Sequence, residues 1–130
     1  MPEPVGQYFD AEPGVPSRPA TVRLDLPDRS LTFTTDRGVF SAQRVDPGTK
    51  YLLLEAPAPP ATGTFVDLGC GYGPIACTLA LRAPAATVWA VDVNERALEL
   101  CRVNAVAAAA ANVRPALAAD VPEDLAVDLL

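Results

Sequence analysis

The pattern of hydrophobic and polar positions divides the chain into two parts that meet near residue 60. In the first part, residues 21–26 (TVRLDL) and 30–35 (SLTFTT) alternate apolar and polar side chains around a short polar turn. This pattern predicts a β-hairpin. Further on, "DPGTKYLLLEA" predicts a helix, because Asp46 can cap it and Pro47 suits its first position.

In the second part, short apolar runs alternate with helical patterns. Strands are predicted over 64–68, 87–93 and 113–119, and helices over 74–82 and from Asn94, as its cap, to about Ala111. Asn112 is expected to end the second of these helices, and Pro115 favours an edge position for the third strand. Such alternation is typical of an α/β fold with a parallel sheet and covering helices, here of the Rossmann-like type.

The length of 130 residues is near that of a single domain. Three parts are expected along it: an extended N-terminal arm over 1–20, the hairpin and lead-in helix over 21–56, and a βαβαβ portion over 64–130. The segment AVDLL at 126–130 predicts the opening of a fourth strand, so we expect the chain to be truncated there.

Composition narrows the classes of function. The net charge of −6 disfavours a chain whose own surface grips a phosphate backbone. Three cysteines without paired spacing, and no histidine, argue against a zinc site and a secreted disulfide framework. The N-terminus lacks a signal pattern, and no apolar run is long enough to span a bilayer. We therefore expect a cytoplasmic protein without a metal or a membrane partner.

The segment "FVDLGCGYGPIAC" is a strand, a glycine-rich turn and the start of a helix. Gly69, Gly71 and Gly73 leave the backbone bare, so several N–H groups are expected to face a ligand. The dinucleotide fingerprint needs its third glycine at position 74, where this chain has Pro74 and one donor fewer. Asp67 ahead of the turn would repel phosphate and attract an ammonium or a sulfonium. The turn thus favours the head group of an amino-acid zwitterion.

Two further acids follow the next two predicted strands. Asp92 lies 23 residues after Gly69 and can accept hydrogen bonds from both hydroxyls of a ribose. Asp120 is either a contact of an adenine amino group or an ordinary surface carboxylate. A zwitterion-binding turn, a ribose acid and an adenine contact together describe S-adenosylmethionine, and NAD is the alternative ligand.

These residues resemble a known family. "VDLGCGYGPIA" followed by "AVDVNERALEL" resembles class I S-adenosylmethionine-dependent methyltransferases of the methyltransferase small domain group. "LTFTTDRGVFSAQRVDPGTKYLL" resembles the lead-in of the ribosomal RNA small-subunit methyltransferase C type, which methylates guanine N2. The resemblance covers roughly residues 20 to 130.

The resemblance implies roles for individual residues. The methionine end of the cofactor falls to Asp67, Gly69, Cys70, Gly71 and Gly73, the ribose to Asp92, the flanks of the adenine to Val93 and Asn94, and its amino group to Asp120. The reactive Asn-Pro-Pro motif of the family follows the fourth strand and would begin beyond Leu130. No catalytic residue is therefore assigned within residues 1–130, and the chain alone is expected to have little turnover.

The resulting hypothesis is an enzyme of rRNA methylation and processing that acts on a guanine amine in small-subunit rRNA or the 30S subunit. This chain would supply its cofactor-binding portion. Two alternatives stay open: methylation of another amine, on a protein glutamine or another RNA or DNA base, and a non-catalytic cofactor-binding module. Five arginines in the first third of the chain either touch RNA or form a solvated face. The oligomeric state is left open.

Overall fold

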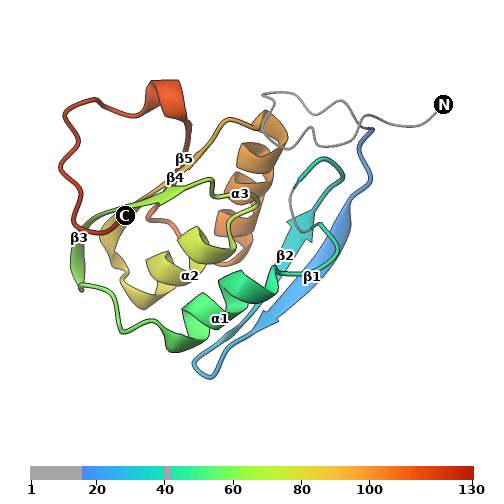
Figure 1. The fold of residues 1–130 in the computed structure, drawn as a ribbon, viewed down its shortest axis with the longest axis horizontal. Helices are drawn as coiled ribbons and strands as arrows, with labels where there is room; N and C mark the ends of the chain where they lie inside the picture. The colour runs from blue at the N-terminus through green and yellow to red at the C-terminus, as the bar shows by residue number, and fades with distance from the viewer. Residues whose placement is uncertain (1–15, 40–41) are drawn as a thin grey trace.

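The computed structural model describes residues 16–39 and 42–130. Residues 1–15, most of the predicted N-terminal arm, lie outside this part. The described residues form a two-stranded antiparallel sheet, a three-stranded parallel sheet and α-helices beside them (Figure 1).

The predicted hairpin is confirmed. Strands β1 (Ala20–Asp25) and β2 (Ser30–Thr35) pair antiparallel over all six residues, and the Leu26 N–H donates to Arg29 O at 2.8 Å to close the turn. Val22 and Phe33, opposite each other in the ladder, are both buried. The alternation therefore gives the hairpin one face that must pack on the rest of the molecule.

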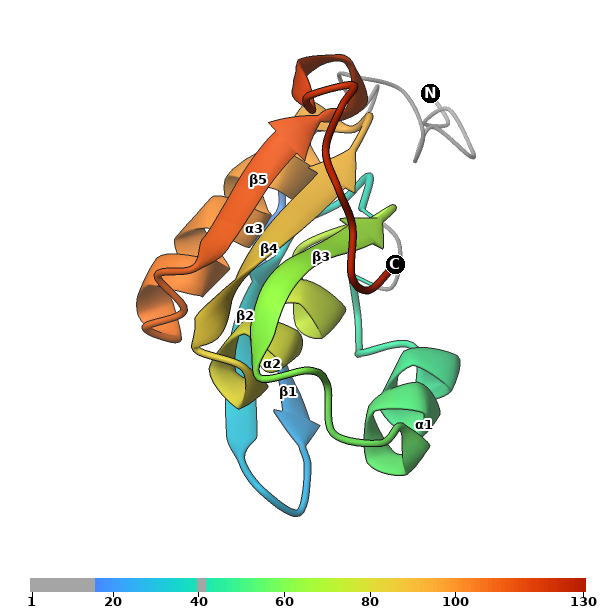
Figure 2. The same ribbon diagram turned by 90° about the vertical axis from the view of Figure 1, so that its left-hand side faces the viewer.

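The predicted α/β architecture is also confirmed. Strands β3 (Thr62–Leu68), β4 (Ala85–Asp92) and β5 (Val113–Leu117) are parallel in the order β3-β4-β5. Both crossovers move the same way across the sheet, so their helices share one face of it. In Figure 2, where the sheet faces the viewer, α2, α3 and the hairpin all lie behind it.

The segment 126–130, predicted as the opening of a fourth strand, runs beside β3. The structure has there one parallel bridge, between Leu129 and Phe65 of β3. It is held by Asp128 N–H to Thr64 O at 2.7 Å and Val66 N–H to Leu129 O at 2.8 Å. β3 thus has β4 on one side and this later segment on the other. The carboxyl end of β3 is therefore a point where the strand order reverses, the usual place for a ligand in such sheets.

Helix α2 (Pro74–Arg82) is capped by Asn112, so the prediction for this residue is wrong. Asn112 was expected to end the following helix, but its Nδ2 donates to Ala80 O, Ala83 O and Ala86 O at 2.9–3.1 Å. These carbonyls belong to the last turn of α2, to its C-cap Ala83 and to Ala86 near the start of β4 (Ala85–Asp92). Asn112 therefore caps α2 from a distance of some thirty residues in sequence.

Helix α3 (Glu95–Ala107) ends four residues before the predicted Ala111. Ala109 adopts a left-handed conformation with φ 58°, and the N–H groups of Ala109 and Ala110 donate to Val106 O and Ala105 O at 3.1 and 2.8 Å. This pair of bonds is the Schellman arrangement, which closes a helix whatever the helix propensity of the next residues. The third strand also ends early, at Leu117, where the short 3₁₀ turn η2 (Ala118–Asp120) begins.

Helix α1 (Pro47–Glu55) starts as predicted, since Asp46 accepts from the Thr49 N–H at 3.0 Å with Pro47 at the first position. Its Leu53 joins the same buried cluster as the hairpin, α2, α3 and the sheet. The hairpin and α1 are therefore part of one core with the βαβαβ portion. None of the described helices has the length and apolar character needed to cross a bilayer.

The left-handed Ala109 generates a stability prediction. A side chain costs about 1 kcal/mol in this conformation, so Ala109→Gly should raise the free energy of unfolding by about 0.5–1 kcal/mol. The control is Ala107→Gly in the last turn of the same helix, which should lower it by about 0.5 kcal/mol. Urea denaturation of the three proteins measures both effects. If neither substitution stabilises the protein, or if both stabilise it equally, Ala109 does not have the left-handed conformation.

Candidate functional site

A cavity of about 470 Å³ opens at the carboxyl ends of β3 and β4, beside the start of α2. This volume suits a small molecule. The predicted site residues that line it are Gly69, Cys70, Gly71, Asp92, Val93 and Asn94. The predicted site residues that are not among its lining residues are Asp67, Gly73 and Asp120.

The three glycines of the turn all have positive φ but serve two purposes. At Gly69 (φ 72°) and Gly71 (φ 58°), an added Cβ would meet no atom within 4 Å, so bare backbone borders open space. At Gly73 (φ 106°), a Cβ would lie 3.0 Å from the Cys101 sulfur and 3.2 Å from that of Cys77. The first two glycines leave room for a ligand, and the third lets α2 and α3 pack.

The expectation that the turn aims its N–H groups at a ligand is wrong for four of them. Gly69 and Cys70 both donate to Val91 O, at 2.8 and 3.0 Å. Gly71 donates to Asp92 Oδ2 at 2.9 Å, and Gly73 to Cys70 O at 3.1 Å. These donors are used inside the protein. A phosphate would need them free, so the turn offers van der Waals space rather than an anion site.

Asp92 connects two loops that line the cavity, the glycine turn and the segment after β4. Its Oδ2 accepts from Gly71 N–H and its Oδ1 from Asn94 N–H, each at 2.9 Å. Each carboxylate oxygen keeps a further lone pair, so two hydroxyl groups of a ligand can still donate to it. Asn94 is buried, accepts from Ala97 N–H at 3.2 Å as the cap of α3, and donates to Gly38 O at 2.9 Å. Val93 beside it is 43 % exposed.

Asp67 lies beneath the glycine turn. Its side chain is buried, and its Oδ2 has no hydrogen-bond partner among the described residues. The pKa of Asp67 is raised to about 7, mainly by burial and further by nearby Cys101 and Asp92, against the lowering effect of the hydrogen bond from the Ala76 N–H. Removing a carboxylate from water disfavours its charged form unless a cation compensates. The unpartnered oxygen therefore favours positive charge in its surroundings.

The other predicted positions are less closely tied to the cavity. Asp120 is exposed at the end of η2, and it is Ala118 of the same turn that lines the cavity.

Cys70, Cys77 and Cys101 are buried free thiols. Hydrogen bonding to Cys101, together with burial, raises the pKa of the Cys70 and Cys77 thiols. Among the described residues no group of histidine, cysteine or acidic side chains could hold a metal ion.

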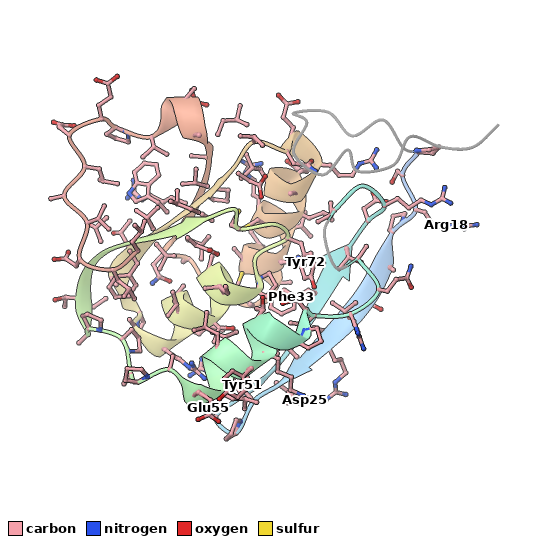
Figure 3. All side chains as sticks on the ribbon, viewed as in Figure 1. Arg18, Asp25, Phe33, Tyr51, Glu55 and Tyr72 are labelled. Atoms are coloured by element: carbon pink, nitrogen blue, oxygen red, sulfur yellow. The ribbon has the colours of Figure 1, made fainter. Side chains whose placement is uncertain are left out.

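One wall of the cavity comes from the lead-in, which the sequence did not place there. Val39, Asp46 and Thr49 line it. Tyr72, in the glycine turn, also lines it and is buried, with its ring centroid 5.8 Å from that of Phe33 in β2 (Figure 3). The sequence signal is "DPGT", in which Asp46 and Pro47 predict the start of a helix and which belongs to the lead-in that carries the family resemblance. Nothing local shows that this helix start meets the glycine turn.

The charge of the cavity selects among ligands. Asp46 and Asp92 are its charged lining residues in the described part of the chain, and Asp67 lies close behind. No arginine or lysine among the described residues lines it. Carboxylates without cations attract a positive ligand and repel a pyrophosphate. Open space at Gly69 and Gly71 and the free lone pairs of Asp92 fit a cationic molecule that carries a diol, as S-adenosylmethionine does.

Comparison with known proteins agrees with this chemistry. The family model described as "Methyltransferase small domain" matches residues 30–129. A curated relative, "Uncharacterized protein YbxB" of Bacillus subtilis, is 40 % identical over 107 residues, which are 82 % of this chain and 53 % of that protein. "Ribosomal RNA small subunit methyltransferase C" of Shewanella sediminis is 38 % identical over 65 % of this chain and 24 % of its own length.

A solved structure also matches. The T. thermophilus 16S rRNA N2 methyltransferase RsmC, in complex with AdoMet and guanosine, superposes with a TM-score of 0.61 at 26 % identity. The match covers 77 % of this chain and 27 % of that chain. The chain thus spans about half of YbxB and about a quarter of the named rRNA methyltransferases. Since the family model matches most of its residues, this protein belongs to the methyltransferase small domain family.

Proposed function

We propose that the protein transfers a methyl group from S-adenosylmethionine to the exocyclic amine (N2) of a guanine in small-subunit rRNA, in the cytoplasm. The residues described here would form its cofactor-binding part. The observation that supports this most is the acidic cavity, in which Gly69 and Gly71 leave open backbone and no described cation lines the wall. The names of the relatives support rRNA as the substrate class.

Each part of the cavity would hold one part of the cofactor. Gly69, Cys70 and Gly71 would border its amino-acid tail, and Asp67 would stabilise the positive charge from beneath the turn. Asp92 would accept from the two ribose hydroxyls while Gly71 and Asn94 N–H groups keep it in place. Val93 would cover a face of the adenine, with Asn94 fixing the backbone behind it.

The cofactor supplies an electrophilic methyl group on a sulfonium, so the protein contributes mainly alignment and exclusion of water. Apolar side chains of the lining, among them Leu68, Ile75 and Val91, keep the cavity wall dry. The Asn-Pro-Pro motif that would orient the guanine amine is not present in residues 1–130. We therefore propose that this chain binds the cofactor and has little turnover alone.

Calorimetry of the purified protein tests the cofactor assignment. Adenosylhomocysteine should release heat on titration, whereas NADH should release none. Its pyrophosphate would face Asp46 and Asp92 with no lining cation among the described residues, and the N–H groups of Gly69, Cys70, Gly71 and Gly73 already donate within the protein. Heat with NADH and none with adenosylhomocysteine would refute the assignment.

Two isosteric variants then locate the ligand. Asp92→Asn should weaken adenosylhomocysteine binding by about tenfold, since one good acceptor and one backbone contact are lost. Asp120→Asn, on an exposed carboxylate that is not a lining residue, should change the affinity by less than about twofold. A loss of affinity in the Asp120 variant instead would support the adenine contact that the family resemblance implies.

A methyl-transfer assay tests the substrate. The full natural gene product that contains these residues is incubated with tritiated S-adenosylmethionine and with 30S particles, naked 16S rRNA or a release factor. Label in a guanine of rRNA is expected. Label on the release factor would favour methylation of a protein glutamine. Binding without transfer to any substrate would favour a non-catalytic cofactor-binding module.

The raised pKa of Asp67 predicts how stability depends on pH. Between the ordinary pKa of 3.8 and about 7, the folded protein keeps a proton that the unfolded chain has released. The free energy of unfolding should therefore fall as pH rises through this range, by up to about 4 kcal/mol, and level off above it. Asp67→Asn should lack this component, so the difference between the two proteins in urea denaturation at pH 4.5 and 7.5 isolates it. If the difference in free energy of unfolding between the two proteins does not change with pH, the pKa of Asp67 is not raised in the folded protein.

A further inference from the structure

One buried amide of α3 reaches both the hairpin and the glycine turn. Asn104 is 2 % exposed. Its Oδ1 accepts from Thr34 N–H at 2.8 Å, and its Nδ2 donates to Thr34 O at 2.9 Å and to Tyr72 O at 2.8 Å. Both donors of the amide are used, and its acceptor is occupied. Asn104 thus pairs with β2 as a neighbouring strand would, and with its remaining donor it holds the turn.

The contact with Tyr72 falls where the turn most needs support. Tyr72 stands between Gly71 and Gly73, both with positive φ, and glycine itself restricts the backbone least. The flanking anchors are Gly71 N–H to Asp92 and Gly73 N–H to Cys70 O. The Tyr72 carbonyl and the Gly73 N–H belong to the same peptide, so Asn104 holds the oxygen of this peptide while Cys70 O accepts from its N–H. Loss of Asn104 would remove a donor from the buried Tyr72 carbonyl and leave this peptide less firmly held.

Asn104 itself is not a cavity-lining residue, whereas Gly71 and Tyr72 are. We infer that Asn104 is a positioning residue for cofactor binding: through the Tyr72 carbonyl it fixes the turn on which the amino-acid tail rests, and through Thr34 it makes that turn depend on the hairpin. This inference rests on the cofactor-binding role proposed above. It predicts that a change at Asn104 alters ligand affinity beyond its effect on stability.

The chain offers a matched control. Asn112 is a half-buried asparagine whose Nδ2 also bonds backbone carbonyls, three of them, but these cap α2 at the opposite end of the sheet. Asn104→Ala and Asn112→Ala therefore remove the same group and several hydrogen bonds each. Asn104→Asp is a second variant, equal in shape, that keeps the acceptor for Thr34 N–H and loses both donors.

The test measures adenosylhomocysteine affinity by calorimetry and thermal stability for all four proteins, below the melting temperature of each. Melting should fall in all three variants. Affinity should fall by about tenfold in both Asn104 variants and by less than about twofold in Asn112→Ala. Folded Asn104 variants with wild-type affinity, or an equal loss in Asn112→Ala, would overturn the inference. Failure of the wild type to bind would instead refute the proposed cofactor role.

A measurement on the wild-type protein covers the case in which the Asn104 variants do not fold. Coupling between two sites is reciprocal, so a ligand bound at the turn should also stabilise the hydrogen bonds between Asn104 and the Thr34 backbone. Adenosylhomocysteine should slow hydrogen exchange of the Thr34 N–H more than that of the Ala86 N–H, which donates to Ala83 O near Asn112. Equal slowing of the two amides would overturn the inference.

Discussion

The site depends on a single carboxylate at the end of β4. Asp92 accepts from the N–H of Gly71 in one loop and of Asn94 in the next, so it fixes the distance between the two loops that border the cavity. These bonds also use N–H groups that a phosphate ligand would need. One side chain therefore sets the shape of the cavity and limits the class of ligand it can take.

Charge makes this limit stronger. The cavity gathers Asp46, Asp92 and, behind the turn, the partly neutralised Asp67, in a protein whose net charge is −6. For a cationic sulfonium such surroundings are favourable, because each carboxylate gains a counter-charge. For a nucleic acid they are not. An RNA substrate would thus have to be held by surfaces other than this cavity wall.

Much of the fold could be predicted from local patterns. The hairpin, the βαβαβ order and the caps at Asp46 and Asn94 follow from periods and capping residues that lie within a few positions of each other. The end of α3 could not, because alanines favour continuation and the left-handed turn at Ala109 is set by packing. The partners of Asn112, in α2 and at the start of β4, could not be predicted either, because they are tertiary contacts far away in sequence.

In the candidate site, too, some features follow from local sequence and others from tertiary contacts. Glycines with positive φ are predictable from the motif, whereas the N–H groups of Gly69 and Gly71 donate to residues of β4 more than twenty positions away. Local sequence also gives no sign that Val39, Asp46 and Thr49 form the opposite wall. That wall exists because the hairpin and α1 share the core of the sheet.

The shared core has a consequence for how the family is delimited. The family match begins at residue 30, inside the hairpin, and leaves β1 outside. Yet β1 pairs with β2 along its whole length and buries Val22 and Leu24 in the common core. A protein cut at the boundary of sequence similarity would expose that apolar face and an unpaired edge of β2. The smallest unit that keeps this core intact is therefore larger than the segment that the family model matches.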